Sequence, residues 1–157
     1  MSSLFEVVFE NVVKSNVIRL LMLLIAGAGR ITNIQCSENI RLIIEGDLDV
    51  KALDSVLSFH GDVTVLINLV DMKIGGVTLP KVLLRWVKYG DLYDIDFNFD
   101  SNDLEDMGMM NLVTALHGDI KEIAKDNGVV AFFGGMEPAS DEDTRYFTND
   151  VLGPLSS

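Results

Sequence analysis

Residues 91–106 read DLYDIDFNFDSNDLED, and this stretch decides the fold class of the chain. It carries seven carboxylates and no basic residue, and from Tyr93 to Asp100 apolar and polar side chains alternate. Alternation with a period of two is typical of a half-buried strand. We therefore expect residues 92–99 to form a strand with an aromatic face in the core and an acidic face outside it.

The same acids come close to the twelve-residue pattern of a calcium-binding loop. The ligand positions would be filled by Asp94, Asp96, Asn98, Asp100 and Glu105. That pattern requires glycine at its sixth position for a sharp turn, and Phe99 stands there. A loop curled around an ion cannot also be an extended strand, so we expect an acidic strand face and no metal site.

The composition predicts a folded chain with an acidic surface. Hydrophobic residues make up 48% of the 157 residues and charged residues 23%, which suffices for a hydrophobic core. We therefore expect residues 1–157 to form a single domain. The net charge of −12 argues against nucleic acid or a membrane surface as a partner, because both are bound by lysine and arginine. A basic protein partner and solubility alone are both consistent with this charge.

Two features indicate a cytoplasmic protein. Cys36 is the single cysteine and cannot form a disulfide within the chain, as is usual in a reducing compartment. The apolar run 17–28 is shorter than the roughly twenty residues of a membrane-spanning helix. Acidic residues precede this run, which is not typical of a signal peptide. We expect the run to form a buried helix.

Periodicity and turn residues predict elements in the order β-α-β-β-α-β-β-β-α-β. The expected strands cover residues 4–11, 31–36, 39–45, 63–70, 82–89, 92–99 and 129–133, and the helices cover about 16–26, 49–59 and 104–125. This order indicates an α+β fold, a largely antiparallel sheet with about three helices packed on it. Its first part matches the order of ferredoxin-like folds. Residues 134–157 lack periodicity, and we expect an irregular acidic tail packed on the surface.

The sequence contains no recognisable catalytic motif. Its histidines, His60 and His117, have no second histidine or cysteine at metal-ligand spacing, and neither stands in a nucleophile–base arrangement. Gly134 and Gly135 could bring backbone N–H groups to a phosphate, but no lysine or helix follows and acids are nearby. We therefore expect no enzyme activity and no cofactor. A small enzyme or ligand-binding domain with a pocket beside these glycines is the alternative.

Arg145 stands alone among the acids of the segment DEDTRY, residues 141–146. One interpretation is a local ion pair that holds the tail in place, which contributes little when exposed. The other interpretation is an anchor at a protein interface together with Tyr146, because arginine and tyrosine are enriched at such interfaces.

A small acidic α+β chain with one cysteine and no catalytic residues resembles bacterial immunity proteins of polymorphic-toxin or contact-dependent growth-inhibition systems. The segment FFGGMEPASDEDTRYFT, residues 132–148, is similar to segments of such proteins. The resemblance implies a cognate basic toxin domain, often a nuclease, that is bound and blocked. An acidic surface suits such a partner. The expected partner-binding residues are Asp94, Asp96, Asp100, Asp103, Glu105, Asp141, Glu142, Asp143, Arg145 and Tyr146. An oligomeric structural module is a further alternative, and the oligomeric state stays open.

Overall fold

The computed structural model of the chain describes residues 3–154. Its strands are β1 (Leu4–Glu10), β2 (Arg30–Cys36), β3 (Ile43–Ile44), β4 (Asp47–Leu48), β5 (Val63–Ile74), β6 (Val77–Tyr89), β7 (Leu92–Asp100), β8 (Ala131–Met136), β9 (Arg145–Thr148) and β10 (Val151–Leu152). Its helices are α1 (Lys14–Ala26), α2 (Ala52–Leu57), the 3-10 helix η1 (Ser101–Met107) and α3 (Met109–Asp126).

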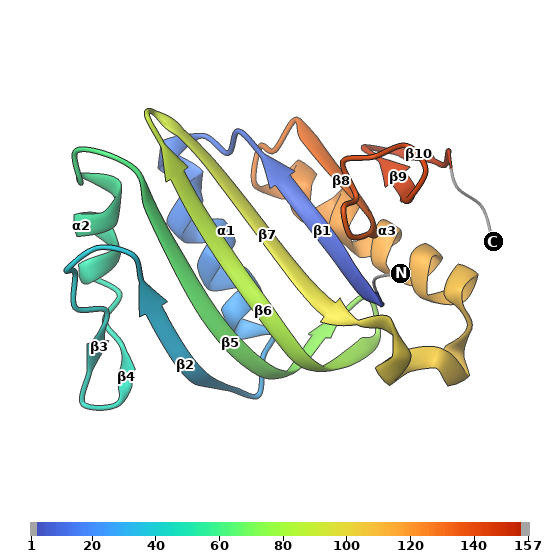
Figure 1. Cartoon of the computed structure of the whole chain (residues 1–157), viewed down its shortest axis with the longest axis horizontal. Helices are drawn as coiled ribbons and strands as arrows, with labels where there is room; N and C mark the ends of the chain where they lie inside the picture. The colour runs from blue at the N-terminus through green and yellow to red at the C-terminus, as the bar shows by residue number, and fades with distance from the viewer. Residues whose placement is uncertain (1–2, 155–157) are drawn as a thin grey trace.

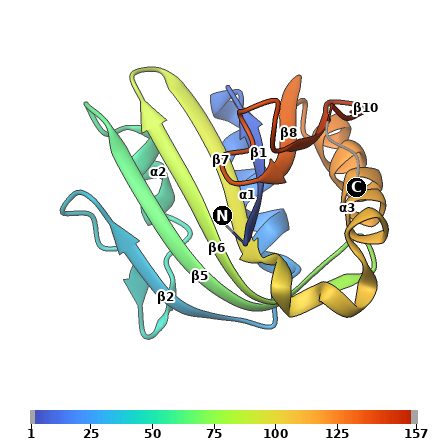
Figure 2. The same cartoon turned by 45° about the vertical axis from the view of Figure 1, so that its right-hand side comes forward.

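Eight strands form one antiparallel sheet in the order β10-β9-β8-β1-β7-β6-β5-β2, and β3 and β4 form a separate hairpin (Figure 1). The predicted α+β fold with a large antiparallel sheet and about three helices is confirmed. Strand β7 lies near the middle, between β1 and β6, so the stretch that decides the fold class also joins the two halves of the sheet. Figure 2 shows the strong twist of this sheet.

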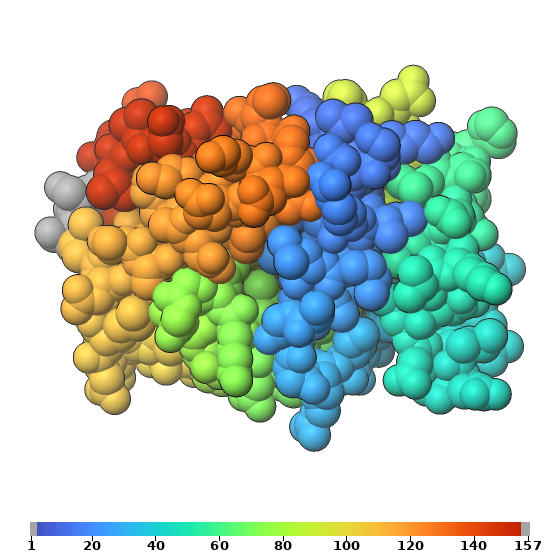
Figure 3. All heavy atoms as spheres, turned by 180° about the vertical axis from the view of Figure 1, so that it is seen from behind, coloured from blue at the N-terminus to red at the C-terminus, as the bar shows by residue number. Residues whose placement is uncertain are grey.

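One face of the sheet carries the core. The apolar side chains of β7 at Tyr93, Ile95, Phe97 and Phe99 are buried, as their alternation predicts. Helix α1 packs against this face with Val17, Leu20, Leu21 and Leu24, which follow helical spacing. Helix α3 contributes Leu112, Val113, Leu116 and Ile120 at the same spacing. Seen from behind, α1, α2 and α3 cover this side of the molecule (Figure 3). The predicted buried helix within 17–28 is therefore confirmed.

The long β5–β6 hairpin turns at Gly75 and Gly76 and reaches α3 at its tip. The N–H of Gly75 donates to Asp119 Oδ2 at 3.0 Å. Gly75 has a φ of +59°, and a Cβ atom there would lie 2.9 Å from the carbonyl carbon of Ala115. A larger residue would therefore push the hairpin away from α3, which explains why glycine stands at this contact.

The connection between the first two strands differs from the ferredoxin-like arrangement expected for the first part. Three strands, β7, β6 and β5, lie between β1 and β2. The reason is that β7 pairs with β1 along its length, from Phe5 opposite Phe99 to Phe9 opposite Ile95. Helix α1 therefore links a central strand to the edge strand β2.

Three other segments differ from the prediction. The strand expected over 39–45 is reduced to β3, which pairs with the unpredicted strand β4 outside the large sheet. The helix expected over 104–125 is divided into η1 and α3 at Gly108, whose φ of +83° is incompatible with a continuous helix. The tail expected to be irregular contains the end of β8 and the strands β9 and β10, while residues 155–157 lie outside the described residues. Tyr146 and Phe147 are both buried, so β9 lacks the simple alternation that identifies a strand in the sequence.

Within residues 3–154 no helix is long and apolar enough to cross a membrane.

Candidate functional site

Among residues 3–154 no helix packs on the second face of the sheet, and we call it the uncovered face (Figure 1). Cross-strand register assigns its residues, because side chains directly opposite each other point to the same side. They are Glu6, Val8 and Glu10 on β1, Asp94, Asp96, Asn98 and Asp100 on β7, Lys81, Leu83, Arg85, Val87 and Tyr89 on β6, and Thr64, Leu66, Asn68 and Val70 on β5. The acidic side of the predicted strand therefore lies at the centre of this face.

The uncovered face combines negative charge with apolar side chains. On strands β1, β7, β6 and β5 its acids are Glu6, Glu10, Asp94, Asp96 and Asp100, and its bases are Lys81 and Arg85. Between them stand partly exposed apolar residues, namely Val8, Leu66, Leu83, Val70 and Val87. A solvated sheet face normally carries mainly polar side chains. The mixture is instead typical of a surface that contacts another protein.

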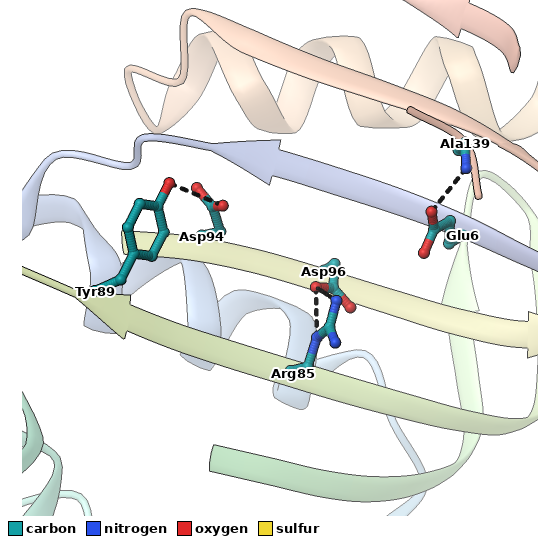
Figure 4. A network of polar contacts seen from close by, with 6 residues as sticks. All are labelled: Glu6, Arg85, Tyr89, Asp94, Asp96 and Ala139. Carbon is teal, nitrogen blue, oxygen red and sulfur yellow. Dashed lines mark hydrogen bonds and ion pairs between the residues drawn. The ribbon is translucent and has the colours of Figure 1, made fainter. Parts of the chain in front are cut away.

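Asp96 lies at the middle of this face and is paired with Arg85 on the neighbouring strand (Figure 4). Arg85 Nε donates to Asp96 Oδ2 at 2.8 Å, and Arg85 Nη2 forms an ion pair with the same oxygen at 2.8 Å. Asp96 is only 2% exposed, and its other oxygen, Oδ1, has no hydrogen-bond partner among residues 3–154. An acceptor buried without a partner costs free energy, so this position is strained in the isolated chain.

Burial raises the pKa of Asp96 to about 6, although the hydrogen bond and charge of Arg85 act in the opposite direction. Negative charge at Glu6 and Asp94 raises it further. Desolvation therefore outweighs the ion pair. For Arg85, burial lowers the pKa, but the hydrogen bond and charge of Asp96, with Glu6 and Glu137, leave it raised overall.

A second polar cluster fixes Asp94 at the end of β7. Asp94 Oδ1 accepts from the backbone N–H of Asn11 at 2.8 Å, and Asp94 Oδ2 lies 3.1 Å from the Tyr89 hydroxyl (Figure 4). Burial, followed by the hydrogen bond and charge of Asp94, raises the pKa of Tyr89, so the hydroxyl acts as a donor at neutral pH. The cluster holds the carboxylate in place and joins β7, β6 and the segment after β1.

The loop 137–144 borders the uncovered face beside β1. The N–H of Ala139 donates to Glu6 Oε1 at 2.8 Å (Figure 4). Arg145 Nε donates to the Ala139 carbonyl at 3.0 Å, Arg145 Nη2 donates to the Ser140 carbonyl, and the guanidinium lies 5.4 Å from the centre of the Phe133 ring. Arg145 therefore holds the loop through carbonyl groups, and within residues 3–154 its side chain forms no ion pair. Its role as an anchor at a protein interface stays a prediction.

The structure brings most of the predicted acids to one side of the molecule. Asp94, Asp96 and Asp100 lie on the uncovered face, and Asp103 lines a hollow of about 530 Å³ on it together with Asn68, Lys81, Leu83, Asn98 and Asp100. Glu105 is exposed on η1, and the exposed acids of the bordering loop are Asp141, Glu142 and Asp143.

Two predicted residues are not freely exposed. Tyr146 is only 8% exposed and stacks on Phe5 with 6.1 Å between ring centres, so the expected surface anchor is a core side chain. The buried Asp96 was expected to face solvent, but its neighbours on β1 and β6 cover it. In both cases burial depends on residues distant in sequence.

The charged residues Glu6, Glu10, Lys81 and Arg85 of this site were not predicted. The alternation of FEVVFE, residues 5–10, places both glutamates opposite the buried side chains, so the sequence held a signal for them. Arg85 carries no such signal, because its contact with Asp96 depends on the pairing of β6 with β7.

Gly134 and Gly135 are explained by packing. A Cβ atom at Gly134 would lie 2.6 Å from Phe147 Cε1, and one at Gly135 would lie 2.7 Å from the Cα of Arg145. Glycine is required here so that β9 can lie close to β8, and no ligand pocket is needed to account for the pair.

Comparison with known proteins identifies the family. The model of the PABL017 Cdi1I immunity protein matches residues 3–152. The chain belongs to this immunity protein family. It also matches a chain of the 1.75 Å crystal structure of the toxic C-terminal tip of CdiA from Pseudomonas aeruginosa in complex with an immune protein. The identity is 35% and the TM-score 0.88, with 99% of this chain and 100% of that chain covered. Comparison with curated proteins finds no similar sequence.

Family membership confirms the resemblance stated from the sequence. It also gives the uncovered face a context, because an immunity protein needs a surface for a protein partner. A binding surface requires no catalytic group, and the site contains a carboxylate–arginine pair and apolar side chains rather than a nucleophile next to a base.

Proposed function

We propose that this chain binds the toxin tip of a CdiA-type protein and neutralises it by occupying its surface. The observation that carries the proposal is the match over nearly the whole chain to an immunity protein family. The structural similarity to a chain from a toxin–immune protein complex supports it, because that similarity also extends over the complete chain.

The charge of the chain defines the kind of toxin that it suits. A net charge of −12 attracts a basic domain over a distance of several ångströms and accelerates its association. A nuclease is the preferred candidate, because its active surface is basic in order to hold phosphate groups. Carboxylates placed on that surface would compete with the nucleic acid substrate.

The acidic contacts are assigned to residues around the uncovered face. Two groups of acids would attract the basic toxin. On β7 and η1 they are Asp94, Asp100, Asp103 and Glu105, and on the bordering loop they are Asp141, Glu142 and Asp143. Arg145 contributes by holding that loop in place. The chain would act as a stoichiometric inhibitor in the cytoplasm, where a delivered toxin acts, and not as an enzyme.

Growth under toxin expression tests this function. Cells would express the toxin tip encoded next to the gene of this chain, with or without the chain itself. We expect growth to stop with the toxin alone and to continue when the chain is present, and we expect the two proteins to purify as one complex. Growth arrest in spite of an abundant folded chain would contradict the proposed function.

A further inference from the structure

The buried carboxylate oxygen Asp96 Oδ1 needs an explanation that the isolated chain does not supply. The other carboxylate oxygen, Oδ2, accepts the hydrogen bond from Arg85 Nε and forms the ion pair with Arg85 Nη2. Oδ1 accepts none from residues 3–154, although the residue is 2% exposed. Buried polar atoms normally have partners, and one that lacks a partner calls for an explanation such as strain, a functional role or a bound water or ion. A donor from another molecule would remove this cost.

The surroundings of Asp96 indicate what kind of molecule brings that donor. Val8 lies directly opposite Asp96 on β1, and Arg85 lies opposite it on β6, with Leu83 and Val87 as the next residues of β6 on the same face. These apolar side chains are partly exposed around a buried polar centre. A protein interface has this arrangement, in which a central polar contact is surrounded by apolar atoms that exclude water.

Charge complementarity selects between two occupants of this face. A second copy of the chain would place the five acids of one face against the five acids of the other, which opposes association. A partner with arginine or lysine at the contact would instead gain from them. The face therefore favours a basic partner.

We propose that the uncovered face is the surface on which the toxin docks, and that an arginine or lysine of the toxin donates a hydrogen bond to Asp96 Oδ1 beside Arg85. This inference rests on the proposed function and adds the location and the anchoring contact. Arg85 keeps the carboxylate oriented in the free chain, and its guanidinium shifts far enough for the toxin side chain to reach Oδ1.

Calorimetric titration of the toxin tip, refolded after separation from the complex, tests the location. Val87→Arg adds a bulky cation to the uncovered face, and we expect it to weaken binding at least about 10-fold. Val130→Arg is the matched control, because Val130 is 83% exposed and lies beside residues of α3. We expect this control to change the affinity by no more than about twofold.

The anchoring contact is tested with Asp96→Asn, which keeps the shape and removes the charge. We expect the variant to bind at least about 30-fold more weakly than wild type at neutral pH, because a buried charged partner is lost.

The pH dependence of binding gives a second test of this contact. The charged groups around Asp96 are Arg85 on β6, Glu6 on β1, Asp94 on β7 and, through Arg85, Glu137. Since Asp96 must be ionised to accept from a cation, wild-type affinity should fall about tenfold as the pH falls one unit below 6. The Asp96→Asn variant should lack this component.

The outcomes separate the two proposals. If wild type does not bind the toxin tip, the proposed function fails, and this inference fails with it. If wild type binds and both Val87→Arg and Asp96→Asn bind equally well, only the docking surface is wrong. A second result would also overturn the docking surface. It is a wild-type chain that dimerises, together with a Val87→Arg variant that no longer dimerises but binds the toxin tip with unchanged affinity.

Discussion

Arg85 Nε donates a hydrogen bond to Asp96 Oδ2 at 2.8 Å and Arg85 Nη2 forms an ion pair with the same oxygen at 2.8 Å, while Asp96 Oδ1 has no hydrogen-bond partner among residues 3–154. The pair lies across β6 and β7 at the centre of the uncovered face. Desolvation destabilises the ionised carboxylate more than the ion pair with Arg85 stabilises it, because the pKa of Asp96 is raised rather than lowered. The pair is therefore better explained by recognition of a partner than by stability of the fold.

Asp96→Asn should stabilise the free chain at neutral pH. The pKa of Asp96 is raised from 3.8 to about 6 in the folded chain. The protonated carboxyl group is therefore favoured by the folded state. Its contribution to the free energy of unfolding is fully present below about pH 4 and is lost as the pH rises through about 6. At neutral pH the ionised carboxylate lowers the free energy of unfolding by about 3 kcal/mol. Urea denaturation should show a variant that is more stable than wild type at neutral pH and similar to it at pH 4. If the two proteins differed in free energy of unfolding by the same amount at both pH values, ionisation of Asp96 would not be the cause of the difference.

Gly134→Ala should destabilise the chain by about 1–3 kcal/mol, because the added methyl group overlaps the ring of Phe147. Gly118→Ala provides the matched control. A Cβ atom at Gly118 meets no atom within 4 Å, and alanine favours a helix interior, so a gain of about 0.5–1 kcal/mol is expected. Chemical denaturation measures both, and equal effects of the two substitutions would refute the packing role of Gly134.

Arg145→Gln should loosen the loop 137–144. The substitution removes the donors to the carbonyls of Ala139 and Ser140 and the contact with Phe133. Amide hydrogen exchange should accelerate in the loop, for example at Asp141 and Thr144, and remain unchanged in α1. Arg41→Gln is the control, because Arg41 is exposed and its Nε donates to the nearby Ile43 carbonyl. Unchanged exchange in the loop of the Arg145 variant would show that other contacts hold it.

The sequence predicts the elements whose neighbours are close in the chain or whose pattern is regular. The alternation in β7 and the helical spacing in α1 identify both elements and their buried sides. The pattern breaks at Pro80, so residues 75–80 are not recognisable as part of a long hairpin. In the structure Pro80 lies within β6, between Leu79 and Lys81, where the opposite residue Asp71 has a φ of +54°. Pro80 has no N–H to donate to this part of the ladder.

The site could be predicted only in part for a related reason. The outward direction of Asp94, Asp96 and Asp100 follows from alternation alone. The pairing of Asp96 with Arg85 and the contact of Glu6 with Ala139, 133 residues away, depend on strand register and on the path of the loop. Burial of Tyr146 likewise depends on its stacking against Phe5. No local pattern encodes these long-range contacts.

Charge reversal at η1 should slow association with the toxin. Asp103→Lys with Glu105→Lys replaces two exposed acids beside the uncovered face by bases. The association rate, measured by stopped flow, should fall about tenfold at low salt, and the difference from wild type should shrink as salt is added.

Glu122→Lys with Asp126→Lys makes the same change of net charge on α3, on the opposite side of the molecule, and its effect should be clearly smaller. Equal slowing by the two double variants would mean that net charge alone, and not its position, attracts the toxin.

Methyl NMR of the chain during titration with the toxin tip is the most direct measurement of where the toxin binds. The uncovered face carries methyl groups at Val8, Leu66, Leu83 and Val87. The helical side carries the exposed residues Leu23 and Val130, at 46% and 83% exposure. The proposed docking surface predicts large chemical shift changes in the first group and none in the second. Changes confined to Leu23 and Val130, with Val8 and Val87 unaffected, would contradict it.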